Sequence, residues 1–123
     1  MKEILGKKLG MTRVFKDTGE AVSVTVLEVG PCPIVAKQTV EKHGYEAYQI
    51  GLGKRRKSRI NKPMAGHFGA VKVEPTQYLK EVRFTEADLE VGSDLTVDRF
   101  KEGERVDVSG ISRGLGFAGT MKR

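Results

Sequence analysis

Residues 21–29 read AVSVTVLEV, and the character of their side chains alternates with a period of two. The valines from Val22 to Val26 fall on one face, whereas Ser23 and Thr25 fall on the other. Such alternation predicts a β-strand with two different faces. The strand is expected to end at Gly30, where a Gly-Pro-Cys-Pro sequence begins.

Similar short stretches recur along the chain, separated by turns rich in Gly, Pro and Asp. The chain has 123 residues, which is the length of one domain. Six or seven short strands with Gly/Pro turns favour a mainly β fold, either a small barrel or a sandwich, over residues 1–123. The predicted strands are residues 12–15, 21–29, 34–40, 45–52, 78–84, 95–100 and 105–109. Residues 41–44 are predicted to form a hairpin loop, and residues 85–90 a polar connection or a single helical turn.

The charge of the chain is segregated. Six of the nine residues from Lys54 to Lys62 are Lys or Arg and none is acidic, so this run alone equals the formal net charge of +6. Residues 109–123 add three basic residues and no acid, which leaves 13 Lys and Arg against 16 Asp and Glu elsewhere. A slightly acidic body with two basic segments is typical of a polyanion-binding protein, and nucleic acid is the first polyanion to consider.

The basic run lies in a region without strand or strong helix periodicity, so an inserted basic loop is predicted over residues 53–74. Residues 61–68 are compatible with one short helical turn that has Pro63 at its first position. Binding of nucleic acid or another polyanion is favoured, because six like charges repel one another in an ordered loop without a counter-anion. A nuclear-localisation signal and a solvated charged loop are the alternatives.

Residues 114–119 read GLGFAG, which matches the G-x-G-x-x-G pattern of dinucleotide-binding loops. That function requires a following helix and an acidic residue about 20 positions further on, but only four residues follow Gly119. A glycine-rich basic segment that runs close to a phosphate backbone is the better interpretation.

The remaining reactive side chains indicate no catalytic or metal site. Cys32 is the only cysteine and is predicted to be a small apolar residue, and His43 is predicted to lie in a turn. No acid/base pair, triad or metal cluster stands out, so neither an enzyme nor a cofactor is expected. No stretch approaches the roughly 20 apolar residues of a membrane span, and residues 1–8 lack the apolar core of a signal peptide. We therefore expect a cytosolic protein without membrane contact.

Four stretches go beyond composition: residues 4–12 (ILGKKLGMT), 29–32 (VGPC), 61–68 (NKPMAGHF) and 112–123 (SRGLGFAGTMKR). In this order they resemble the bacterial-type ribosomal protein L-three family of the large subunit. The resemblance covers the whole chain from one end to the other, and the four motifs together are specific.

The resemblance implies a translation-factor-like β-barrel that binds ribosomal RNA of the large subunit and takes part in early assembly. It also implies contact with neighbouring large-subunit proteins and a loop that reaches toward the peptidyl transferase centre. Family members continue beyond the position of Arg123, so the barrel is expected to be incomplete in these residues. The family's role is architectural, so the expected function is that of a structural constituent of the cytoplasmic ribosome.

The residues expected to contact RNA form three groups. The main group is Lys54, Arg55, Arg56, Lys57, Arg59 and Lys62, followed by a secondary surface of Lys7, Lys8 and Arg13, and by Arg113, Lys122 and Arg123 at the start of a basic extension over residues 110–123. His67, beside Phe68, is a candidate for stacking on an unpaired base or ribose, with local packing of the loop as the alternative.

Two functions from other classes compete with this one. A self-associating half barrel would act as a protein-assembly module and form a homo-oligomer through its unpaired strand edges. A nucleotide-dependent enzyme rests only on the glycine pattern of residues 114–119.

Overall fold

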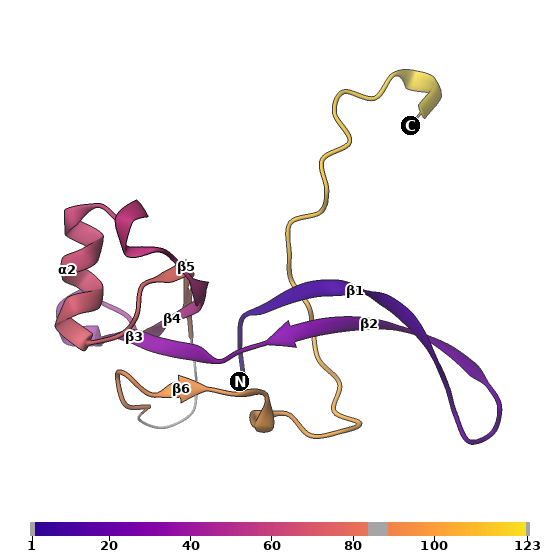
Figure 1. Cartoon of the computed structure of the whole chain (residues 1–123), viewed down its shortest axis with the longest axis horizontal. Helices are drawn as coiled ribbons and strands as arrows, with labels where there is room; N and C mark the ends of the chain where they lie inside the picture. The colour runs from indigo at the N-terminus through magenta and orange to yellow at the C-terminus, as the bar shows by residue number, and fades with distance from the viewer. Residues whose placement is uncertain (1, 84–88, 123) are drawn as a thin grey trace.

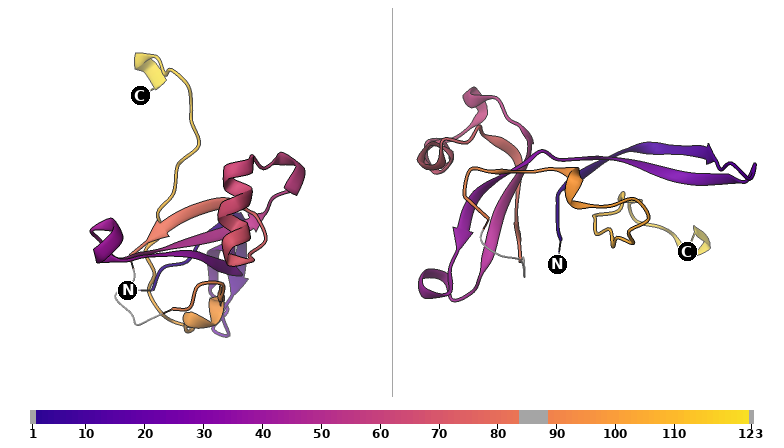
Figure 2. Two further views of the ribbon diagram at one scale, coloured as in Figure 1. Left: turned by 90° about the vertical axis from the view of Figure 1, so that its left-hand side faces the viewer. Right: turned by 90° about the horizontal axis from the view of Figure 1, so that it is seen from below.

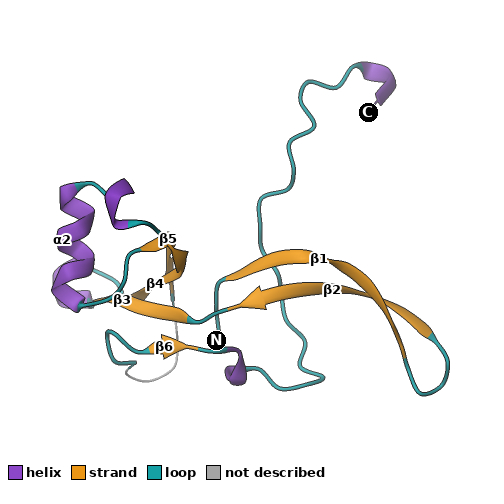
Figure 3. Ribbon diagram, viewed as in Figure 1, coloured by secondary structure: helices purple, strands orange, loops and turns teal. Residues whose placement is uncertain are grey.

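The computed structural model describes residues 2–83 and 89–122, and the chain is mainly β (Figure 3). Its strands form a two-stranded hairpin, β1-β2, and a four-stranded antiparallel sheet in the order β5-β4-β3-β6. Figure 1 shows the hairpin extending from one side of the sheet, helix α2 on the other side, and the C-terminal segment running away from both. The predicted mainly β class is therefore confirmed.

The hairpin consists of β1 (Gly6–Phe15) and β2 (Ala21–Val29). Strand β2 has the predicted bounds, whereas β1 extends the predicted residues 12–15 back to Gly6. The turn between them contains Gly19 at φ +82°, a left-handed conformation that glycine adopts without steric cost. The N–H of Gly19 donates to the carbonyl of Lys16 at 2.8 Å, which closes the turn.

The four-stranded sheet follows the predicted pattern with small shifts. Each predicted bound of its first three strands lies within two residues of the observed one, although Phe84, at the end of a predicted strand, lies outside the described residues. The hairpin loop predicted before β4 is instead the short helix α1 (Val40–His43), which ends at Gly44 with φ +80°. The strands are β3 (Cys32–Gln38), β4 (Ala47–Lys54), β5 (Thr76–Val82) and β6 (Asp94–Leu95).

The core of the molecule lies on this sheet. Ile34 and Ile50 are register partners on β3 and β4, and both are fully buried. Truncating such a side chain to Ala costs about 2–5 kcal/mol, so these strands carry much of the stability. Ile4 and Leu5 pack against the cluster and tie the base of the hairpin to the sheet. The buried cluster is Cys32, Ile34, Tyr48, Ile50, Val82 and Leu95.

Two predicted strands are wrong. Residues 95–100 contain only the end of β6, followed by the 3₁₀ turn η2 (Val97–Arg99), and residues 105–109 form no strand. Val106 and Val108 alternate as in a strand, but both are exposed, so no apolar burial offsets the entropy of ordering a strand there. The predicted connection at residues 85–90 lies largely outside the described residues.

The barrel predicted from strand count and resemblance is not confirmed. The described strands form two separate sheets, and neither closes on itself. The hairpin pairs only within itself, so both of its outer edges lack a neighbouring strand in the described part of the chain. Figure 2 shows this hairpin projecting away from the rest of the molecule.

Beyond η2 the chain leaves the sheet as an extended arm (Figure 1). Every residue from 101 to 117 is exposed, and the described part of the chain ends in the 3₁₀ turn η3 (Thr120–Lys122). Across the residues that the structure describes, no helix combines the length and apolar character needed to cross a membrane.

Candidate nucleic-acid interface

Residues 54–62, called the basic segment from here on, connect the end of β4 to helix α2. The chain leaves β4 at Lys54, turns through the 3₁₀ helix η1 (Lys57–Arg59) and enters α2 (Lys62–Val71). The N–H of Arg55 donates to the carbonyl of Pro75 at 2.9 Å, which holds the start of the segment against the chain entering β5. The backbone of the segment is thus anchored at both ends by regular structure.

The predicted loop over residues 53–74 therefore contains a helix of ten residues. The predicted helical turn is confirmed, but Pro63 is the second residue of the helix and not the first as predicted, and the helix extends three residues beyond the predicted end at Phe68. Asn61 is its N-cap, and the Oδ1 atom of Asn61 accepts a hydrogen bond from the N–H of Met64 at 3.3 Å. Two glycines inside the helix lower its intrinsic propensity, which explains why the sequence pattern indicated only one turn.

Helix α2 is held to the sheet by Phe68, which is 3% exposed and is the buried residue of the helix. The helix ends at Lys72 in a left-handed conformation with φ +59°. The N–H of Val73 donates to the carbonyl of Phe68 at 3.2 Å, so the last turn is capped by the chain that follows it. These contacts fix the helix that terminates the basic segment.

The charges of the basic segment are largely uncompensated. Within residues 2–83 and 89–122, its side chains make a single ion pair, between Lys54 and Glu74 at 3.0 Å. The Lys54 ammonium, hydrogen-bonded to Glu74, lowers the pKa of that carboxyl. The pair is highly exposed, and such pairs contribute little to stability. The other five cations of the segment (Arg55, Arg56, Lys57, Arg59 and Lys62) are exposed and have no acidic side-chain partner in the described structure.

A small hollow lies where the basic segment meets α2 and β5. Its volume is about 180 Å³, and Arg55 and Arg59 line it together with residues of the helix and the strand. Thr76, at the start of β5, also lines it, and the Oγ1 atom of Thr76 is buried without a hydrogen-bond partner among the described residues. No sequence pattern indicated Thr76, because it lies 14 positions after Lys62 and comes close to the basic segment only in the folded chain.

His67 makes local contacts that the sequence did not settle. Its Nε2 atom lies 2.7 Å from Oε1 of Gln49 on β4, and its ring meets that of Phe68 edge to face at a centroid distance of 5.8 Å. Both contacts agree with local packing of this region. The ring of His67 is exposed beside the basic segment, so it is accessible to an unpaired base, and base stacking by His67 stays a prediction.

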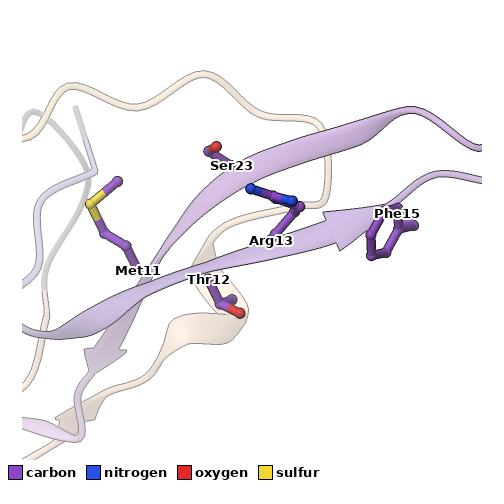
Figure 4. Close-up of a pocket in the computed structure, with 5 residues that line it drawn as sticks. All are labelled: Met11, Thr12, Arg13, Phe15 and Ser23. Carbon is purple, nitrogen blue, oxygen red and sulfur yellow. The ribbon is translucent and has the colours of Figure 1, made fainter.

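The secondary group, Lys7, Lys8 and Arg13, lies on β1 of the hairpin, and all three side chains are exposed. Lys7 is the register partner of Glu28, and Arg13 is the partner of Ser23. Figure 4 shows Arg13 and Ser23 at the edge of an open hollow along the hairpin, which Met11, Thr12 and Phe15 also line.

The C-terminal group lies on the extended arm. Arg113 and Lys122 are exposed, whereas Arg123 lies outside the described residues. The arm, the hairpin and the basic segment occupy separate parts of the molecule in both Figure 1 and Figure 2, so the three groups do not form one compact site. The basic segment is the densest of the three.

The other reactive side chains agree with structural roles. Cys32 is fully buried on β3, and burial raises the pKa of its thiol, in agreement with the predicted small apolar residue. After the GLGFAG motif of residues 114–119 the described chain, which runs to residue 122, forms the 3₁₀ turn η3. In the part of the chain that the structure describes, no group of three or more His, Cys, Asp or Glu side chains could hold a metal ion.

The chain is similar to ribosomal proteins from two bacteria. No protein-family model matches it. Over 123 residues, or 99% of the chain, it is 50% identical to large ribosomal subunit protein uL3 of Carboxydothermus hydrogenoformans and 52% identical to the protein of the same name from Pelotomaculum thermopropionicum. The chain covers 59% of the length of each relative. The resemblance to the large-subunit ribosomal protein L-three family, first indicated by four sequence motifs, is thus confirmed along essentially the whole chain.

Proposed function

We propose that this chain is an RNA-binding structural constituent of the large ribosomal subunit and that the basic segment is its main contact with ribosomal RNA. The proposal rests first on one observation, which is that five exposed cations of the segment have no acidic partner in the described structure. Cations in this state neutralise phosphates and release counterions from RNA. The similarity to uL3 supports ribosomal RNA as the polyanion.

The other two groups fit a supporting role in the same function. Lys7, Lys8 and Arg13 present positive charge along the hairpin, and Arg113, Lys122 and Arg123 do so at the end of the arm. Since contacts to phosphates position a protein without reading sequence, three separated groups would orient the chain on a folded RNA. We place the chain in the cytoplasm on the large subunit, where neighbouring subunit proteins are further partners. We assign it a role in assembly and no catalytic role.

The sheets fit the proposed incomplete barrel of the translation-factor type. The hairpin has unpaired edges in the described residues and exposed Leu9, Met11 and Phe15, and the chain covers 59% of the length of each uL3 relative. Unpaired edges favour the addition of further strands. The competing assembly module, a self-associating half barrel, gains no support from the comparisons, and neither does a homo-oligomer.

The salt dependence of RNA binding tests the proposed interface. Replacement of Arg55, Arg56 and Arg59 by Ala is expected to weaken binding of the chain to a large-subunit RNA fragment. Each lost phosphate contact should reduce the slope of log K against log salt by about 1, so the slope should fall by about 2–3. Fluorescence anisotropy at several salt concentrations measures it.

The matched control removes the same charge elsewhere. Replacement of Lys42, Lys80 and Lys101 by Ala also lowers the net charge by three, but these exposed lysines lie outside the three groups. This control is expected to change the slope by much less than the arginine variant. Equal slopes for the two variants would mean that net charge alone drives binding, and the assignment of the basic segment would be wrong.

A further inference from the structure

The hollow beside the basic segment has two kinds of lining. The buried ring of Phe68 and the side chain of Met64 supply apolar surface from α2, while Arg55 and Arg59 supply positive charge from the segment. An apolar surface beside two guanidinium groups suits a flat, uncharged ring joined to a phosphate. A solvated charged surface needs only the arginines and no apolar lining.

The size of the hollow restricts what it can hold. Its volume of about 180 Å³ is below the roughly 300–1,000 Å³ of typical small-molecule sites. A dinucleotide or a drug-sized ligand would therefore not fit, whereas a single ring with its phosphate outside would match the space. The hollow opens next to the exposed basic segment, where a phosphate would meet Arg55 and Arg59.

Asn61 supplies a polar group with a fixed orientation. The Oδ1 atom of Asn61 caps α2 by accepting from the N–H of Met64, which directs the amide so that its NH₂ group remains as a donor. Asn61 is exposed and lines the hollow, so its NH₂ group is accessible to a ligand there. Thr76 adds a buried hydroxyl oxygen without a hydrogen-bond partner among the described residues. A buried polar atom without a partner beside a hollow is one that a polar ligand can satisfy, and the exposed Asn61 amide lies next to it.

We propose that the hollow receives one unpaired base of ribosomal RNA, packed on Met64 and Phe68 and hydrogen-bonded by the Asn61 amide, while Arg55 and Arg59 hold the adjoining phosphates. This inference rests on the proposed RNA-binding function and deepens it. It makes the basic segment a reader of single-stranded RNA, because a base in a duplex is stacked and cannot enter the hollow. RNA binding by the segment thus has two separable components: a charge component, in which cations bind phosphates, and a base component, in which the hollow binds a base.

Two conservative variants remove the base component without touching a cation. Met64→Ala deletes apolar lining at a helix position where Ala is the best helix former. Asn61→Ser keeps an N-cap oxygen but removes the NH₂ donor. The affinity of each variant for a single-stranded octauridylate, measured by anisotropy, is expected to fall about tenfold, within the range of one lost base contact. Thermal unfolding checks that both variants remain folded.

A base-free polyanion separates the two components. Inorganic polyphosphate offers phosphates without bases, so both variants should bind it as the unchanged chain does, and their salt slopes should match that of the unchanged chain. Equal losses on octauridylate and polyphosphate, or no loss on either, would overturn the base site while leaving the RNA-binding function intact. Failure of the unchanged chain to bind any large-subunit RNA would instead overturn the proposed function itself.

Discussion

Gly51 shows how a single missing side chain shapes the neighbourhood of the basic segment. It lies on β4, where its register partner on β5 is Leu79, and a Cβ atom added there would meet Cγ2 of Thr76 at 2.5 Å. Gly51→Ala should therefore displace Thr76 and lower the free energy of unfolding by about 1–3 kcal/mol, as overpacking does. Urea denaturation of the purified chain measures this change.

Gly10 provides the control for that substitution. It also lies in a strand, but no atom lies within 4 Å of an added Cβ. Gly10→Ala should leave the free energy of unfolding unchanged or raise it by up to about 1 kcal/mol, since Ala loses less backbone entropy on folding. A Gly51→Ala variant as stable as Gly10→Ala would contradict the observed packing of Thr76 on β4.

At the residue scale, the sequence predicted the cations of the candidate site better than the shape of the hollow beside them. The six cations of the basic segment could be read directly, because like charges adjacent in sequence remain adjacent on a surface. The hollow could not be predicted, since Thr76 comes from another strand and Phe68 is buried only once α2 has packed on the sheet. The orientation of the Asn61 amide likewise depends on a cap that forms with the helix.

At the scale of elements, helix α2 carries the next prediction. Gly66 lies inside the helix, and nothing lies within 4 Å of a Cβ added there. Gly66→Ala should raise the free energy of unfolding by about 0.5–1 kcal/mol, because Gly is disfavoured in a helix interior. Urea denaturation followed by far-UV circular dichroism measures stability and helix content together.

Gly44 is the matched control for the helix. It ends α1 with φ +80°, a conformation that Ala adopts only with strain, so Gly44→Ala should be destabilising. The free energy of unfolding is therefore expected to rise for Gly66→Ala and to fall for Gly44→Ala. If Gly66→Ala did not change the free energy of unfolding, α2 would not be formed in the free chain, and a destabilising effect would contradict the open space around Gly66.

The elements differ in how well the sequence predicted them. Strand β2 matched its predicted bounds because its side chains alternate from Val22 to Val26 and the turn signals on both sides are clear. Helix α2 was underestimated because Gly66 and Gly69 weaken its helical signal, and tertiary burial of Phe68 supplies the missing stability. Residues 105–109 have a strand-like pattern, but alternation without burial does not produce a strand.

At the scale of the whole molecule, the hairpin and the four-stranded sheet should open independently. An isolated two-stranded hairpin is marginally stable at best, and β1-β2 pairs with no other strand in the described residues. Amide hydrogens of β1 should therefore exchange much faster than those of β4, which is paired on both sides. Hydrogen exchange read by mass spectrometry measures the difference.

Equal exchange rates for the amide hydrogens of β1 and β4 in the free chain would contradict this prediction. They would mean that another surface covers the hairpin, as in the competing self-associating half barrel. Addition of large-subunit RNA should slow exchange in the basic segment whether or not it affects the hairpin. Strand content and charge could be predicted from the sequence at this scale, but sheet closure could not, because closure depends on long-range pairing that local alternation does not encode.

The extended arm has a consequence for the proteolysis of the chain. Its residues from 101 to 117 are all exposed, and Ile111 and Phe117 are almost fully so. Proteases cleave such segments most readily. The free chain should therefore be cut first within the arm. Under the proposed function, burial of the arm against ribosomal RNA would shield it, so resistance to proteolysis would report whether the chain is bound.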